Sequence, residues 1–127
     1  MSDHTNALIL IVDDSSTMRR IMRLTLKKCG YENTEEAENG RIGLEKAQTK
    51  QFDCIISDWN MPEMTGIEMV AELRKLPAYT ATPIMMVTTE GGKEAVVQAL
   101  QAGVSSFIVK PFTADVLRQK MDVLWGD

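Results

Sequence analysis

Residues 54–66 read CIISDWNMPEMTG, and this stretch decides how the rest of the chain is interpreted. A short apolar run ends in a single carboxylate, Asp58, and a loop with Pro62 and Gly66 follows. A continuous apolar run of this length is typical of a parallel strand that is covered on both faces. Asp58 is therefore either a cap or turn residue or a group that does chemistry at the end of a buried strand.

Four further segments have the length of a strand. Residues 7–12 (ALILIV), 83–88 (PIMMVT) and 106–110 (SFIVK) are nearly continuous apolar runs. Residues 33–37 (NTEEA) are polar, and only their position in the chain makes them an edge or near-edge strand.

Segments with helical spacing separate these strands. Ser15 and Ser16 are good helix N-caps, and Gly30 marks the end of the helix that they begin. The other helical segments are residues 39–48, 66–76, 93–103 and 113–125. This alternation, with short connections, predicts an α/β fold: a (βα)5 doubly wound, five-stranded parallel sheet of the flavodoxin-like type.

The composition is that of one ordinary globular domain, residues 1–127. Of the 127 residues, 44% are hydrophobic and 25% charged, close to the usual ~45–50% and ~25%. The formal net charge of −4 argues against a nucleic-acid partner. The longest apolar run is far shorter than the roughly 20 residues that cross a bilayer. Cys29 and Cys54 lack metal-binding spacing, so we expect a cytoplasmic protein with reduced thiols and no membrane partner.

Polar side chains stand where the predicted strands end. Asp13 and Asp14 follow the first strand, and Asp58 follows the third. Thr88 ends the fourth strand and Lys110 the fifth. Ligands of doubly wound sheets bind at the carboxyl ends of the strands. We therefore expect three carboxylates, a hydroxyl and an ammonium at one edge of the sheet.

Crowded carboxylates need a positive charge nearby, since two unit charges 4 Å apart repel by about 4 kcal/mol at an effective dielectric of 20. Lys110 or a divalent cation such as Mg²⁺, which prefers oxygen ligands, would supply it. A carboxylate beside Mg²⁺ and a lysine is also a suitable nucleophile toward phosphorus. Each residue alone has a simpler role, such as a helix cap for Asp14 or a turn residue for Thr88. Their joint occurrence at successive strand ends favours the chemical role.

Four motifs together resemble the receiver domain of bacterial response regulators. They are VDDSSTMRR (12–20), SDWNMPEMTG (57–66), MVTTE (86–90) and FIVKPFT (107–113). The resemblance covers nearly the whole chain, so we expect no output domain. The DWNMP and KPFT segments are most similar to single-domain chemotaxis regulators.

The resemblance implies a magnesium site and a phosphoryl acceptor. Asp58 is the implied acceptor and also a metal ligand. Asp14 is expected to bind Mg²⁺ directly, and Asp13 largely through water. The backbone carbonyl of Asn60 completes the protein ligands.

The resemblance also implies a switch. Lys110 pairs with a phosphoryl oxygen, the Thr88 hydroxyl turns toward it, and the Lys110–Pro111 bond is cis. Phe107 stands where chemotaxis regulators have a tyrosine that swings inward, so it is either a switch residue without the hydroxyl or an ordinary core aromatic.

Three positions lie where the family tunes hydrolysis of the acyl phosphate: Asn60, Thr89 and Glu90. Thr89 is larger than the residue usual there and would narrow access to the site. Glu90 has the simpler explanation of first-turn helix polarity.

We therefore expect a monomeric signalling switch with Mg²⁺ as its cofactor. A chemotaxis-type histidine kinase would phosphorylate Asp58, and the partners would be a flagellar motor switch protein and a phosphatase. Catalysis would be limited to self-phosphorylation and autodephosphorylation. A phosphate sink or a phosphorelay intermediate are alternative roles.

Two other protein classes fit the residues less well. A haloacid-dehalogenase-type phosphatase places its nucleophile and acid at alternate positions after the first strand, whereas Asp13 and Asp14 are adjacent. A flavin carrier needs a phosphate loop rich in Ser, Thr and Gly at that point, and DDSSTMRR is acidic there.

Overall fold

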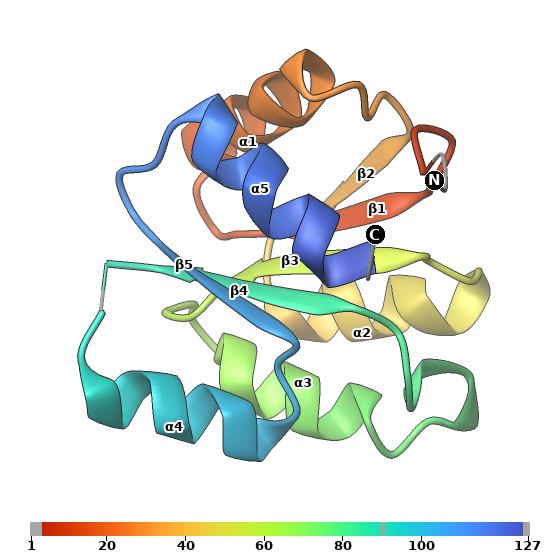
Figure 1. Cartoon of the computed structure of the whole chain (residues 1–127). Coiled ribbons are helices and arrows are strands. Elements are labelled where there is room, and N and C mark those ends of the chain that lie inside the picture. The colour runs from red at the N-terminus through yellow and green to blue at the C-terminus, as the bar shows by residue number, and fades with distance from the viewer. Residues whose placement is uncertain (1–3, 90, 126–127) are drawn as a thin grey trace.

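The computed structural model describes residues 4–89 and 91–125. Within these stretches, five strands form one parallel sheet, and a helix follows each strand (Figure 1). The strands are β1 (Ile9–Val12), β2 (Thr34–Ala37), β3 (Cys54–Asp58), β4 (Ile84–Thr88) and β5 (Ser106–Val109). The helices are α1 (Ser16–Lys28), α2 (Gly40–Thr49), α3 (Gly66–Leu73), α4 (Lys93–Ala102) and α5 (Ala114–Trp125), with a 3₁₀ turn, η1 (Pro77–Tyr79), before β4.

The strand order is β2-β1-β3-β4-β5, which confirms the predicted doubly wound sheet. Helices α1 and α5 cover one face, and α2, α3 and α4 cover the other (Figure 1). The order reverses between β1 and β3, so the crevice at the carboxyl ends of these two strands is the expected ligand position.

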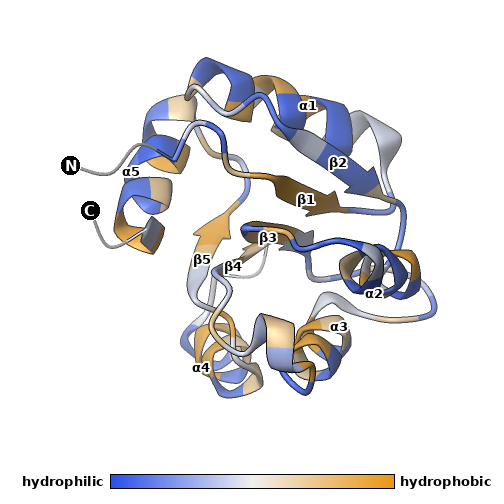
Figure 2. Ribbon diagram, turned by 90° about the vertical axis from the view of Figure 1, so that its right-hand side faces the viewer, coloured by the Kyte–Doolittle hydropathy of each residue, from blue (hydrophilic) through white to orange (hydrophobic). Residues whose placement is uncertain are grey.

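Two apolar layers hold the helices to the sheet. Beneath α1 and α5, the buried side chains include Met22, Leu26, Leu117 and Met121. The other layer lies between the sheet and α2–α4. All residues of β1 and β4 are buried, whereas the polar edge strand β2 is mostly half-buried. Figure 2 shows the contrast between the hydrophobic central strands and the hydrophilic edge strand β2, and the helices carry hydrophilic residues on their outer sides.

Side chains cap the helices near the predicted positions. The Ser15 hydroxyl accepts a hydrogen bond from the Met18 amide at 3.2 Å, so Ser15, and not Asp14, caps α1. The Thr113 hydroxyl caps α5 through the Val116 amide, also at 3.2 Å. Gly30 follows α1 with φ of 97°, a conformation that glycine adopts at little cost.

Helix α3 ends earlier than predicted, at Leu73 instead of residue 76. The next backbone bonds tighten to the i→i+3 type, with the Lys75 amide donating to the Glu72 carbonyl at 3.2 Å. Pro77 begins η1 rather than stopping α3. Proline disfavours the helical conformation at the residue before it, and Leu76 is extended, with φ of −85° and ψ of 127°. The guanidinium of Arg74, the C-cap residue of α3, bonds distant loops. It donates to the carbonyls of Tyr79 and Thr82 at 2.7 Å and to Gly103 at 2.7–3.0 Å.

Both cysteines, Cys29 and Cys54, are free, as the sequence predicted. Across residues 4–89 and 91–125, each helix is too short or too polar to cross a membrane.

Candidate functional site

Three carboxylates meet at the carboxyl edge of the sheet. Asp13 and Asp14 follow β1, and Asp58 ends β3. The two strands are neighbours with Val12 opposite Ser57, and one carboxylate oxygen from each aspartate lies within 4.8 Å of the others. The topology therefore brings these residues together as the strand pattern predicts.

Lys110, directly after β5, reaches this cluster from two strands away. Its Nζ lies 3.2 Å from Asp58 Oδ1 and 3.8 Å from Asp13 Oδ2. The Lys110 amide donates to the Thr88 carbonyl at 2.7 Å, which ties the end of β5 to the end of β4. The Lys110–Pro111 peptide bond that follows is cis, in agreement with the resemblance.

The cluster is poorly solvated and carries excess negative charge. The side chains of Asp13, Asp58 and Lys110 are only 10%, 13% and 17% exposed. Burial, followed by the charges of Asp58 and Asp14, raises the pKa of Asp13, and the Ser15 amide and Lys110 offset this only in part. A cation bound beside this cluster would favour the charged form of Asp13.

The donor set fits Mg²⁺, which prefers a few carboxylates and retains several waters. Asp13, Asp14 and Asp58 offer hard oxygen donors at one place, and Asp14 is exposed to solvent. A cavity of about 20 Å³ touches Asp13, Asp58 and Lys110, which is room for roughly one water molecule. It has no room for an organic cofactor such as a flavin.

The β3–α3 loop closes tightly onto Asp58. The Gly66 amide donates to the Trp59 carbonyl at 2.8 Å, and a Cβ atom on Gly66 would lie 2.3 Å from the Asp58 carbonyl oxygen. Glycine is therefore required by this close approach. Thr65 and Glu68 form a capping box that fixes the start of α3.

The predicted switch residues, Thr88 and Phe107, lie on neighbouring strands, β4 and β5. Thr88 is buried at the end of β4, and the next residue, Thr89, is exposed. Phe107 is half-buried on β5 and packs against the α2–α4 layer. Its ring meets Trp59, the residue after Asp58, edge to face with centroids 6.2 Å apart. The sequence analysis missed this aromatic pair, although Trp59 directly follows the acceptor strand.

The residues predicted to tune hydrolysis lie on loops. Asn60 is exposed after β3 and lines a groove with Trp59, Gly92 and Gln98. Gly92 begins α4 without a side-chain cap. Glu90 lies outside the described residues. The roles of these residues, and those of the acidic cluster, stay predictions.

Comparisons with known proteins agree on one family. Residues 9–122 match the family model described as response regulator receiver domain. The chain is 51% identical over 122 residues to the chemotaxis protein CheY1 of Helicobacter pylori, covering 93% of this chain and 96% of that protein. It is 50% identical over 120 residues to the chemotaxis protein CheY homolog of Campylobacter jejuni, covering 93% and 92%.

A solved structure has the same architecture. The chemotaxis protein CheY4 of Vibrio cholerae superposes with a TM-score of 0.87 at 42% identity, covering 94% of this chain and 98% of that one. The family match spans both aspartates after β1, Asp58 and Lys110, and the sheet presents these residues at one edge. The chain is therefore a signalling protein that belongs to the response regulator receiver domain family.

Proposed function

We propose that this chain is a chemotaxis phosphorylation switch in which Asp58 accepts a phosphoryl group from the phosphohistidine of a histidine kinase. The observation that carries the proposal is the position of the Asp58 carboxylate. It lies 3.2 Å from the Lys110 ammonium and beside two further carboxylates that can share a cation with it. The chemotaxis names of the relatives support the pathway.

Each residue of the site has a defined task in this proposal. An Asp58 carboxylate oxygen forms the bond to phosphorus while the phosphorus–nitrogen bond to the kinase imidazole breaks. Asp13, Asp14, Asp58 and the Asn60 carbonyl would hold Mg²⁺, which neutralises charge on the phosphoryl oxygens when it is bound. Lys110 pairs with another phosphoryl oxygen, at the place where it pairs with Asp58 in the unmodified protein. Water later hydrolyses the acyl phosphate and restores the carboxylate.

The output is a change in affinity for a partner. Thr88 follows the phosphoryl group, and Phe107 responds through its packing beside Trp59. Such couplings are typically worth about 1–3 kcal/mol. The partner is a flagellar motor switch protein, and Asn60, Thr89 and Glu90 adjust how fast hydrolysis or a phosphatase ends the signal. The switch acts as a monomer, and its catalysis is limited to its own phosphorylation and dephosphorylation.

The first test is the intact mass of the protein after incubation with acetyl phosphate and Mg²⁺. Wild type is expected to gain one phosphoryl group, which Asp58→Asn or a chelator abolishes. The matched control is Asp115→Asn, which removes a carboxylate that is 85% exposed and lies outside the cluster. An adduct on Asp58→Asn, or none on wild type, overturns the proposal.

A second test separates a motor regulator from a phosphate sink. The beryllofluoride-treated protein is titrated with a fluorescent peptide from a flagellar motor switch protein. A motor regulator binds several-fold more tightly with beryllofluoride than without it. Equal binding in both states, together with rapid draining of phosphoryl groups from a shared kinase, identifies a sink.

A further inference from the structure

We infer that Arg19 is a positioning residue for the loop that carries Asp13 and Asp14, and that it thereby sets the affinity of the site for Mg²⁺. This inference rests on the proposed function. It assigns a role in metal binding to a cationic side chain that cannot itself be a metal ligand.

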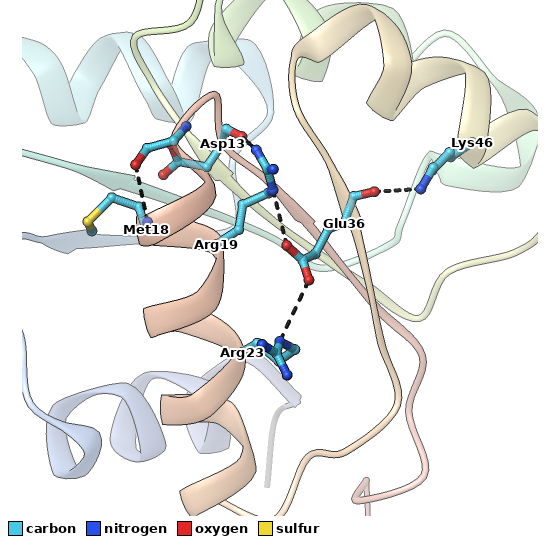
Figure 3. A network of polar contacts seen from close by, with 7 residues as sticks. Asp13, Met18, Arg19, Arg23, Glu36 and Lys46 are labelled. Carbon is cyan, nitrogen blue, oxygen red and sulfur yellow. Dashed lines mark hydrogen bonds and ion pairs between the residues drawn. The ribbon is translucent and has the colours of Figure 1, made fainter.

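Arg19 leaves the first turns of α1 and reaches back over the end of β1 (Figure 3). Its Nη1 donates to the backbone carbonyl of Asp13 at 2.6 Å, and its Nε donates to Glu36 Oε1 at 3.0 Å. The side chain is only 16% exposed. A planar guanidinium makes both bonds at once, because its donors form a rigid fork.

The Asp13 carbonyl belongs to the peptide group that joins Asp13 to Asp14. Holding this oxygen therefore fixes the plane of that peptide group and the direction in which Asp14 leaves it. The rest of Asp13 is also held, since its amide donates to the Ala37 carbonyl at 3.1 Å and its Oδ1 accepts from the Ser15 amide at 2.9 Å. Arg19 thus holds the peptide group before the exposed residue Asp14, and the Ser15 amide bond holds the peptide group after it.

Glu36 in turn keeps Arg19 in place. It lies on β2, opposite Ile11 of β1, so the sheet fixes its backbone. Its other carboxylate oxygen lies 3.6 Å from Arg23 Nε, and its backbone carbonyl accepts from Lys46 Nζ (Figure 3). A chain of contacts thus runs from α2 through β2 and Arg19 to the metal loop. Groups that orient metal ligands in this way typically contribute about 10–100-fold to metal affinity.

Arg23 is a matched control, because it carries the same charge on the same helix and pairs with the same carboxylate. It differs in two respects: its side chain is 46% exposed, and it pairs with Glu36, whereas Arg19 also donates to the Asp13 carbonyl. A general effect of positive charge on α1 would therefore appear in both Arg19→Ala and Arg23→Ala. A positioning effect would appear only in the first.

The experiment measures the Mg²⁺ dissociation constant of the full chain without a phosphodonor. Fluorescence quenching is a suitable readout, because Trp59 directly follows Asp58. We expect Arg19→Ala to weaken Mg²⁺ binding about tenfold and Arg23→Ala less than about twofold. Arg19→Lys keeps the charge but not the fork, and it is expected to lie between Arg19→Ala and wild type.

Urea unfolding without Mg²⁺ distinguishes an effect of Arg19 on Mg²⁺ affinity from an effect on the stability of the fold. If Arg19 only stabilises the fold, Arg19→Ala lowers the unfolding midpoint while the Mg²⁺ dissociation constant stays at the wild-type value. That result, or equal dissociation constants for Arg19→Ala and Arg23→Ala, overturns the inference. Should Arg19→Ala fail to fold, the same comparison is made with Arg19→Lys and Glu36→Gln, and Mg²⁺ affinities equal to wild type in both again overturn it.

Phosphorylation by acetyl phosphate gives a second, separate readout. For Arg19→Ala, the Mg²⁺ concentration that gives half the maximal rate should rise by the same factor as the dissociation constant, with the maximal rate retained within about threefold. A wild-type protein that binds Mg²⁺ but takes up no phosphoryl group refutes the proposed function and leaves the Arg19 comparison intact. The two failures are therefore distinguishable.

Discussion

The polar side chains at the two ends of the strands have opposite kinds of partner. At the edge where the strands begin, Arg74 donates to three backbone carbonyls, and the Tyr79 hydroxyl lies 2.7 Å from the carbonyls of Ala47 and Lys50. At the edge where the strands end, Asp13, Asp14 and Asp58 crowd together against Lys110.

The difference lies in how well each group is matched. Neutral carbonyls satisfy the charge of Arg74 through good hydrogen bonds, although burial still lowers its pKa. Burial, and after it the repulsion from Asp58 and Asp14, raises the pKa of Asp13. The first edge therefore contributes stability. At the second edge, local stability is lower than it could be, as is common at functional sites.

We expect the largest loss of stability from removing the Arg74 hydrogen bonds at the edge where the strands begin. Arg74→Met leaves the carbonyls of Tyr79, Thr82 and Gly103 without their donor. We expect the free energy of unfolding to fall by about 3 kcal/mol, since a bond to a charged group is worth ~1.5–3 kcal/mol. Urea denaturation measures this. The neighbouring control Lys75→Met removes a side chain that is 74% exposed and should change stability by less than about 0.5 kcal/mol.

Tyr79→Phe tests the same edge with a smaller change. Tyr79 is 1% exposed, and its hydroxyl accepts a hydrogen bond from the Phe52 amide at 3.2 Å. Removing the hydroxyl leaves that buried amide without an acceptor, so we expect a loss of about 2 kcal/mol. A thermal and urea midpoint equal to wild type would show that water replaces the hydroxyl and that this edge is less well satisfied than we argue.

Adding Mg²⁺ tests the acidic edge separately, because we expect the ion to bind there and not at the edge that holds Arg74 and Tyr79. At ten times its dissociation constant, a ligand that binds only the folded state adds about 1.4 kcal/mol to stability. We expect this increment in wild type and in Arg74→Lys, because the two edges share no partners, and a much smaller one in Asp58→Asn. Unequal increments in wild type and Arg74→Lys would mean that the edges are coupled.

The smallest effect has the opposite sign. Without Mg²⁺, Asp13→Asn should stabilise the fold by on the order of 1 kcal/mol, because it removes repulsion that Lys110 offsets only in part. Asparagine keeps an acceptor for the Ser15 amide. The control is Asp53→Asn at the beginning of β3, where the carboxylate accepts from the Leu8 amide and lies outside the acidic cluster. It should leave stability unchanged within about 0.5 kcal/mol, and an equal gain in both variants would contradict the repulsion argument.

Much of the fold and of the site follows from the amino-acid sequence. Continuous apolar runs locate β1, β3, β4 and β5 within two residues, because strands covered on both faces leave no polar alternation. Parallel strands end at one edge, so the meeting of Asp58 with Lys110 follows from strand order alone. β2 could be placed only by its position in the chain, because an edge strand is less buried and need not be apolar.

The hydrogen bonds from arginine side chains to distant backbone carbonyls could not be predicted. Arg19 belongs to a basic face of α1 that is usually just solvated, and Arg74 reads as an ordinary helix residue. Both side chains bond to backbone carbonyls in other loops, and such partners leave no mark in the sequence because every residue carries a carbonyl.

The strand order also bears on how the protein is made. Asp13, Asp14 and Asp58 leave the ribosome well before Lys110, and a domain generally folds as one unit. Pairing of β1 with β3 brings the carboxylates together, and their counter-charge on Lys110 follows the last strand of the sheet to be synthesised. The lysine arrives only when β5 docks beside β4, two strands from Asp58. In a nascent chain that stops short of β5, the three carboxylates therefore lack the lysine that offsets their charge in the folded protein.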